Sequence, residues 1–185
     1  MSQIKTFKSY AKVNLGLKVL DLLPDNYHSI FTIMQEIDFY DTINIQKNNE
    51  NKINLFCDGS VKVPVDKTNL CYKAAELIFN NYNISSGINI FLTKKIPIGA
   101  GLGGGSSNAA TILCGLNQIF KLNISHEEIS ELAILLGCDV PFFIKGGTQI
   151  SEGKGEILTP ININISQHYF LLVFPSFNVS TKWAY

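Results

Sequence analysis

The alternation of apolar and polar positions predicts several strands in the first third of the chain. Residues 7–20 alternate between the two kinds, which is typical of a half-buried strand. The apolar positions of this strand are Val13, Leu15, Leu17 and Val19. Three more strand-like runs follow a polar turn at residues 23–29, namely 30–38, 41–46 and 51–57. Because the turn signals lie close together, we expect an antiparallel meander here.

The period of the pattern lengthens after residue 66, which indicates helices. Residues 66–82 place Leu70, Ala74, Leu77 and Ile78 on one helical face. A strand at 87–97 leads into a glycine-rich loop. The stripe on the helix after this loop consists of Ala109, Ile112, Leu113, Leu116 and Phe120. A third helix begins at Ser125, with Glu128 completing a capping-box pattern, and is expected to stop at Gly137.

The remainder of the pattern predicts an irregular segment and strand at 138–151 and a buried strand at 169–176. Strands and helices are mixed without regular alternation. This order favours an α+β fold in which a mixed or antiparallel sheet packs against helices.

Composition narrows the function classes without selecting one. The 185 residues carry 15 basic and 15 acidic side chains, and these are scattered, which argues against nucleic-acid binding by bulk charge. The longest apolar run, residues 169–174, is too short to span a bilayer, and we find no secretory signal pattern. The four cysteines lack C-x-x-C or zinc-ligand spacing. We therefore expect a cytoplasmic protein with reduced cysteines and no membrane partner.

The segment "IPIGAGLGGGSSNAA", residues 96–110, carries the strongest chemical signal because it places five glycines between a strand and a helix. A flexible linker does not fit, since regular elements adjoin the segment on both sides. Gly99, Gly101 and Gly104 satisfy G-x-G-x-x-G, but a second helix follows where a dinucleotide site needs a parallel strand. The Walker pattern is absent, because no lysine follows the glycines.

A backbone cradle for phosphate is the interpretation that remains. Glycines let successive N–H groups converge on an anion, and the following helix contributes the positive end of its dipole. Ser106 and Ser107 lie in the first turn of that helix. Their hydroxyl groups can cap the helix, or contact a phosphate or its magnesium ion.

Three motifs resemble one known family. "PIGAGLGGGSSNAA" resembles the ATP-binding motif of the GHMP kinases. "AKVNLGLKVLDLLPDNYHSIFTIMQEIDFYDTI" and "LGCDVPFFIKGGTQISEGKGEILTP" resemble the first and third blocks of the branch that acts on a cytidine diphosphate methylerythritol. The motifs occur in the family's order and cover essentially the whole chain. Asn26 stands where the family usually has glycine, and since Asn tolerates a left-handed turn, we expect the turn to be kept.

The resemblance implies ATP-dependent phosphorylation of the 2-hydroxyl of that small molecule, with Mg²⁺, in isoprenoid precursor synthesis. It also implies an N-terminal ATP-binding domain at residues 1–158 and the beginning of a second α+β domain at 159–185. Family members are considerably longer, so we expect this chain to be an N-terminal fragment or a truncated product. The sequence assigns no metal ligands and no oligomeric state.

Residue roles follow from the same resemblance. It implies Lys12 and Asp139 as catalytic residues. The implied ATP-binding residues are Asn69, Leu70, Pro97, Ile98, Gly99, Ala100, Gly101, Leu102, Gly103, Gly104, Gly105, Ser106 and Ser107. The implied substrate-binding residues are Asn14, Tyr27, His28 and Tyr185.

The residues alone leave other interpretations open. Asp139 also suits the start of a turn before Pro141, and Lys12 an exposed strand position. Asn69 is typical of a helix cap, and His28 of a turn histidine bonded to backbone. At the level of function, the alternatives are another GHMP kinase of mevalonate or homoserine type, or a non-catalytic nucleotide-binding module. The segment "DNYH" favours the cytidine-reading branch over the other kinases.

Overall fold

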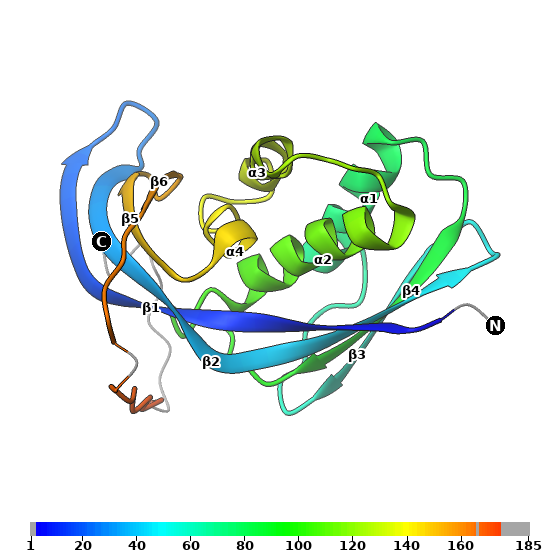
Figure 1. The fold of residues 1–185 in the computed structure, drawn as a ribbon, viewed down its shortest axis with the longest axis horizontal. Coiled ribbons are helices and arrows are strands. Elements are labelled where there is room, and N and C mark those ends of the chain that lie inside the picture. Colours follow the sequence, from blue (N-terminus) through cyan, green and yellow to red (C-terminus); the bar gives the residue numbers. More distant parts are fainter. Residues whose placement is uncertain (1–2, 166, 175–185) are drawn as a thin grey trace.

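The computed structural model describes residues 3–165 and 167–174, and it contains a six-stranded sheet with helices on one face (Figure 1). The strands are β1 (Lys5–Leu22), β2 (His28–Asn48), β3 (Ile53–Gly59), β4 (Gly87–Lys94), β5 (Thr148–Gly153) and β6 (Ile157–Pro160). The helices are α1 (Leu70–Asn81), α2 (Gly104–Phe120), α3 (His126–Ile134) and α4 (Phe142–Lys145). The predicted α+β class is confirmed.

Strand β2 is the centre of the sheet. It pairs with β1 along most of its length, with β4 over residues 42–48 and with β5 over residues 30–35. The prediction of two separate strands at 30–38 and 41–46 is therefore wrong. Because β1 remains paired with β2 across this region, with only a register shift after Tyr10, the backbone hydrogen bonds continue where the sequence suggests a break.

The antiparallel meander is also wrong beyond the first hairpin. Strand β3 pairs in parallel with β4, as in the partners Leu55 and Ile90, and β4 lies between β3 and β2. Parallel neighbours need a long crossover, and helix α1 provides it. This crossover also brings α1 beside α2 above the sheet (Figure 1).

The main core lies between the sheet and helices α1 and α2. Its largest fully buried side chains are Ile43, Ile45, Ile78, Ile88, Ile90, Leu92, Ile112, Leu113 and Leu116. The predicted helical faces are thus confirmed, although Leu70, Leu77 and Phe120 are only partly buried. Ser125 caps α3 by accepting from the Glu128 N–H, but the Glu128 carboxylate accepts from the Tyr82 hydroxyl instead of completing the capping box. The helix ends at Ile134, before the predicted stop at Gly137.

The second half of β1 departs from the prediction of a half-buried strand. Leu15, Leu17 and Val19 are 40%, 43% and 37% exposed, whereas Ser9 and Ala11 are completely buried. Helix α2 packs near the first half of β1, where Phe7 approaches Gly115. Within the described residues, the helical layer buries the first half of the strand and leaves the second half open.

The segment after α3 differs from the prediction in two places. The short helix α4 forms within the predicted irregular region, with Phe142 buried as its anchor. Residues 169–174 form no strand, and Tyr169 and Leu171 are 99% and 90% exposed. A buried strand needs hydrogen-bonding neighbours, and none pairs with this segment among the described residues. Leu172 packs against a small cluster that contains Ala11 and Leu102.

Two further points concern the limits of the domain. Strand β6 pairs with β5 and crosses the predicted boundary at residue 158. In the described part of the chain, no helix is long and apolar enough to cross a membrane.

Candidate active site

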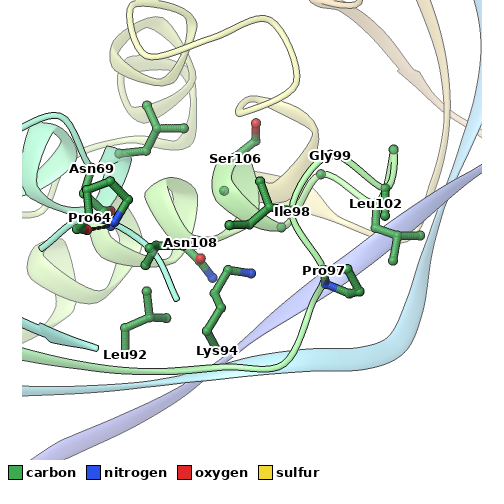
Figure 2. A pocket seen from close by; sticks show the side chains of 17 residues that line it. Pro64, Asn69, Leu92, Lys94, Pro97, Ile98, Gly99, Leu102, Ser106 and Asn108 are labelled. Atoms are coloured by element: carbon green, nitrogen blue, oxygen red, sulfur yellow. Dashed lines mark hydrogen bonds between the residues drawn. The ribbon is translucent and has the colours of Figure 1, made fainter. Parts of the chain in front are cut away.

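A cavity of about 370 Å³ lies at the end of β4, between the first turns of α1 and α2 (Figure 2). All residues from Pro97 to Ser106 line it, together with Asn69 and Leu70. The structure therefore brings every predicted ATP-binding residue except Ser107 to one cavity. Sequence reasoning missed the other lining residues, which are Val63, Pro64, Leu92, Lys94 and Asn108.

The backbone of the glycine loop adopts conformations that favour glycine. Gly99, Gly101 and Gly103 have φ angles of 69°, 73° and 67°. At Gly103 a Cβ atom would also lie 2.7 Å from Cζ of Phe143, so both conformation and space exclude a side chain there. The loop thus depends on glycine for its course, as the sequence predicts.

Helix α2 differs from the other long helices in how it begins. Asn69 caps α1 and Ser125 caps α3, whereas no side chain of the described residues caps α2, which begins after the left-handed Gly103. The first N–H groups of a helix have no partner within the helix. At α2 these groups lie beside the cavity and can bind an anion.

The two serines of the motif have different surroundings. Ser106 lines the cavity at the first turn of α2 (Figure 2). Ser107 is 1% exposed, and its hydroxyl forms a hydrogen bond of 2.7 Å with the Ser9 hydroxyl. Ser106 is therefore the serine that lines the cavity, while Ser107 joins α2 to β1.

Asn69 combines two of the roles considered for it. Its side chain accepts a hydrogen bond of 2.8 Å from the Cys71 N–H and donates one of 2.6 Å to the carbonyl of Pro64 (Figure 2). The helix-cap interpretation is therefore correct. The same residue lines the cavity opposite the loop, together with Leu70.

Lys12 is buried beside the loop. The residue is only 5% exposed, so the interpretation as an exposed strand lysine is wrong. Its N–H donates to the carbonyl of Leu102 at 3.0 Å, which fixes the loop against β1. Its Nζ donates to Oδ1 of Asn14 at 3.0 Å, and this contact confirms that the two residues share a strand face.

Asp139 lies in the turn between α3 and α4 and is partly exposed. Burial lowers the pKa of Lys12, and the negative charge of Asp139 opposes that shift. Within the described residues, no direct ion pair joins the two side chains, so they act on each other through space. On its other side, Asp139 approaches Gly155, where a Cβ atom would lie 3.6 Å from Oδ1.

Of the predicted substrate residues, Tyr27 lies in the turn between β1 and β2, and His28 is the first residue of β2. Asn26 has a φ angle of 64°, so the left-handed turn is kept without glycine. Tyr27 is 59% exposed, and Lys154 of the β5–β6 turn lies 5.3 Å from the centre of its ring. His28 Nδ1 lies 3.2 Å from the carbonyl of Leu20, so the expected contact with backbone is present, although the residue belongs to the strand and not to the turn.

The β5–β6 turn connects this hairpin to the region of Asp139. Lys154 forms an ion pair with Asp25, which lowers the pKa of that carboxyl group, while the next residue, Gly155, lies beside Asp139. The β5–β6 turn therefore contacts both the β1–β2 turn, through Lys154, and Asp139, through Gly155. Tyr185, the remaining predicted substrate residue, lies outside the described residues.

A buried polar group beneath the loop was not predicted. Lys94 is 3% exposed and donates to the Asp41 carboxylate at 2.6 Å. The alternation of Ile88, Ile90 and Leu92 continues onto Lys94, and this period-two pattern is the signal that could have placed the lysine on the buried face.

Comparisons with known proteins agree with this fold. Residues 69–147 match the family model described as the GHMP kinases N terminal domain. The chain is 34% identical to a crystal structure of 4-(cytidine 5'-diphospho)-2C-methyl-D-erythritol kinase, with a TM-score of 0.74 over 86% of this chain and 56% of that one. The fold is therefore that of the N-terminal domain of the GHMP kinases.

The relatives by sequence carry the name of one particular enzyme. The chain is 48% identical over 178 residues to 4-diphosphocytidyl-2-C-methyl-D-erythritol kinase of Clostridium botulinum strain Hall, covering 96% of this chain and 62% of the relative. It is 43% identical to the Clostridium perfringens enzyme of the same name, covering 61% of that protein. The chain thus spans less than two thirds of the length of these relatives. A mevalonate kinase of L. major, at 18% identity and a TM-score of 0.64 over 87% of this chain and 55% of that one, shares the fold alone.

Proposed function

We propose that this chain binds ATP in the cavity and supplies the residues that transfer its γ-phosphoryl group to the 2-hydroxyl of 4-diphosphocytidyl-2-C-methyl-D-erythritol. The observation that carries the proposal is the start of α2, whose uncapped N–H groups lie beside Lys12 on one side and the cavity on the other. The names of the relatives supply the substrate.

The lining of the cavity suggests how the nucleotide would lie in it. Its phosphates bind the glycine loop and the first turn of α2, where backbone N–H groups and the helix dipole stabilise negative charge. The base then lies toward α1, where Leu70, Leu92 and Val63 provide apolar surface and Asn69 provides polar atoms.

Magnesium enters with the nucleotide in this proposal. The described residues contain no group of three His, Cys, Asp or Glu side chains that could hold a metal. A site with few protein ligands still fits Mg²⁺, because that ion is commonly bound by one or two protein oxygens together with substrate phosphates. The Ser106 hydroxyl is the protein oxygen at the loop that would hold it, and the ion would supply positive charge to the phosphates.

The chemical step needs orientation more than covalent help from the protein. The substrate hydroxyl oxygen forms a bond to the γ-phosphorus, while the bond from that phosphorus to the bridging oxygen breaks and ADP leaves. Asp139 accepts the hydroxyl proton. The Lys12 ammonium, buried beside the loop, stabilises the negative charge on the transferred group.

The substrate extends from this centre toward the β1–β2 turn. Asn14 adjoins Lys12 and is the contact nearest the reacting hydroxyl. The exposed ring of Tyr27 can stack on a cytosine base, and His28 lies next to it. Tyr185 is proposed as a further aromatic contact. The boundary near residue 158 between the ATP-binding domain and the start of a second domain also stays a proposal.

The test is coupled ADP release with ATP and the cytidylated methylerythritol substrate. We expect turnover by the wild-type chain and a loss of about 10²- to 10⁴-fold in Asp139→Asn, which keeps the shape but cannot accept the proton. Full activity of Asp139→Asn would contradict the base assignment. Turnover of mevalonate or homoserine instead would contradict the substrate. ATP binding without any turnover would favour the nucleotide-binding module.

A further inference from the structure

A buried carboxylate sits where the two ends of the glycine loop meet. Asp41 of β2 is completely buried, and four groups donate hydrogen bonds to it. Its Oδ1 accepts from the N–H groups of Lys95 and Ile96, at 2.7 and 2.9 Å. Its Oδ2 accepts from Nζ of Lys94 at 2.6 Å and from Nδ2 of Asn108 at 2.9 Å.

The four donors come from opposite sides of the loop. Lys94 is the last residue of β4, and Lys95 and Ile96 follow it before the glycines, whereas Asn108 lies in α2, which begins at Gly104 after them. One side chain on a third element, β2, therefore fixes the distance between the strand end and the helix start. The glycine loop must therefore span this fixed distance between the end of β4 and the start of α2.

The network extends to the other contacts of the helix start. Nδ2 of Asn108 also donates to the Ser9 hydroxyl at 2.8 Å, and Ser9 in turn bonds to Ser107. Lys94 donates a second hydrogen bond, to the carbonyl of Ile96 at 2.9 Å. Its Nζ would lie 2.9 Å from a Cβ atom at Gly104, so the first residue of α2 rests directly on the lysine.

A carboxylate is the group that this position requires. All four partners are donors, and only a side chain with two accepting oxygens satisfies them. The neutral amide of asparagine would turn its NH₂ group toward either the two backbone N–H groups or Lys94. A buried ion pair is weak support for stability as such, and its better-attested role is to select one geometry. The Asp41 network selects the geometry of the phosphate cradle.

We propose that Asp41 is a positioning residue for nucleotide binding, which acts through Lys94–Ile96 and Asn108 to hold the glycine loop in its anion-binding shape. The proposal rests on the proposed function, because the loop is taken to bind ATP. The shape of the loop itself is a property of the protein without ligand, so it can be tested separately.

The first experiment is hydrogen exchange of the unliganded chain, followed over peptides that cover residues 95–108. In Asp41→Asn we expect these amides to exchange at least about tenfold faster, the factor that corresponds to one lost charge-assisted hydrogen bond. The control is Ile88→Ala, which removes a fully buried side chain from β4 and leaves the loop contacts in place. After correction for the global stability of each variant, the control should keep the wild-type exchange of the loop.

Two outcomes would overturn the proposal. One is unchanged loop exchange in Asp41→Asn, and the other is equal acceleration in Ile88→Ala. If Asp41→Asn does not fold, Asn108→Leu replaces it, because this variant removes the hydrogen bonds of Asn108 to Asp41 and Ser9 and keeps the Asp41–Lys94 pair. It should accelerate exchange at the start of α2, and unaltered exchange there would contradict the proposal equally.

The second experiment measures binding of ATP itself by titration with each variant. We expect Asp41→Asn to lose about tenfold or more in affinity while Ile88→Ala keeps the wild-type value. Faster loop exchange together with unchanged ATP affinity would overturn the nucleotide part of the proposal. Absence of ATP binding by the wild-type chain would instead contradict the proposed function, and the exchange result would still decide the role of Asp41 in the loop.

Discussion

Two parts of strand β2 support two halves of the candidate site that are built differently, namely the part around Asp41, here called the loop end, and the start at His28, here called the hairpin end. At the loop end, Asp41 is completely buried and Lys94 nearly so, and both pack beneath α2. At the hairpin end, Tyr27 is 59% exposed and its neighbour Lys154 pairs with Asp25 at the surface. Apolar residues of β1 near this end, such as Leu17, also remain exposed.

The difference in burial determines how each half keeps its shape. Buried hydrogen bonds are costly to leave unmade, so the loop end has one arrangement. Exposed ion pairs contribute little and are screened by salt, so the side-chain contacts at the hairpin end add little to its stability. We therefore expect substitutions at the loop end to act through structure, and those at the hairpin end to alter only the groups that they contact.

The largest expected effect separates catalysis from stability at Lys12. Lys12→Met should lower the rate of ADP release by about 10²- to 10³-fold, the usual cost of removing one preorganised electrostatic group. It should also raise the melting temperature by a few degrees, because it removes a buried charge.

The pH dependence checks the same residue. Since the folded-state pKa of Lys12 lies below 10.5, the unfolded chain binds more protons between that lowered pKa and 10.5. The contribution of Lys12 to stability therefore increases as pH rises through this window, and Lys12→Met should remove that increase. Thermal unfolding at several pH values measures it. A melting temperature that falls together with activity would contradict the account.

A pair of glycine substitutions compares the two ends directly. Gly103→Ala should destabilise the fold by about 2 kcal/mol or more, because it forces a left-handed alanine against Phe143. Gly16→Ala on β1 should be neutral or slightly stabilising, since nothing lies within 4 Å of its Cβ position. Urea unfolding of both variants gives the free energies. Equal destabilisation would remove the distinction between the two ends.

Tyr27→Ala tests whether the hairpin end acts by contact alone. We expect the KM for the cytidylated substrate to rise about tenfold, within the range of one lost aromatic–base stack. The KM for ATP and the melting temperature should stay at the wild-type values, because the side chain is largely exposed. Tyr169→Ala is the matched control, since that tyrosine is 99% exposed. A change in the KM for ATP would show that the hairpin end also affects the ATP site, and it would contradict the expectation of action by contact alone.

The smallest effect is expected at Lys154. Lys154→Met should cost less than about 1 kcal/mol of folding free energy, as is usual for exposed pairs. Its difference from wild type should vanish in about 1 M salt, where the screening length is about 3 Å. Lys67→Met removes the exposed pair with Glu76 and serves as the control for a general loss of charge. A larger cost at Lys154 that persists in salt would place the hairpin end in the same class as the loop end.

The sequence predicted those parts of the molecule that depend on local pattern. The faces of α1 and α2, the course of the glycine loop and the turn at Asn26 follow from periodicity and backbone preference, and all are present. The order of the strands could not be predicted, because β4 enters between β3 and β2 only through the crossover of α1.

Burial decided the remaining differences. Leu15 and Leu17 have the pattern of a buried face, but no helix among the described residues covers them. Lys94 is polar and yet buried, because Asp41, far away in sequence, pairs with it. Ser107 turns away from the cavity for a similar reason, since Ser9 offers it a partner. Each case depends on whether another element packs against the residue, and a local sequence pattern does not contain this information.

The continuity of β2 also has a consequence for how the chain folds. This one strand is completed by partners from β1, β4 and β5, and the contact between Gln35 and Thr148 joins residues 113 positions apart. Pairings of such long range close slowly, because the entropy of the intervening loop is lost before the contacts form. During synthesis the β1–β2 hairpin and the β4 pairing can form first. The neighbourhood of Asp139 is then completed last, after β5 has left the ribosome and paired with β2.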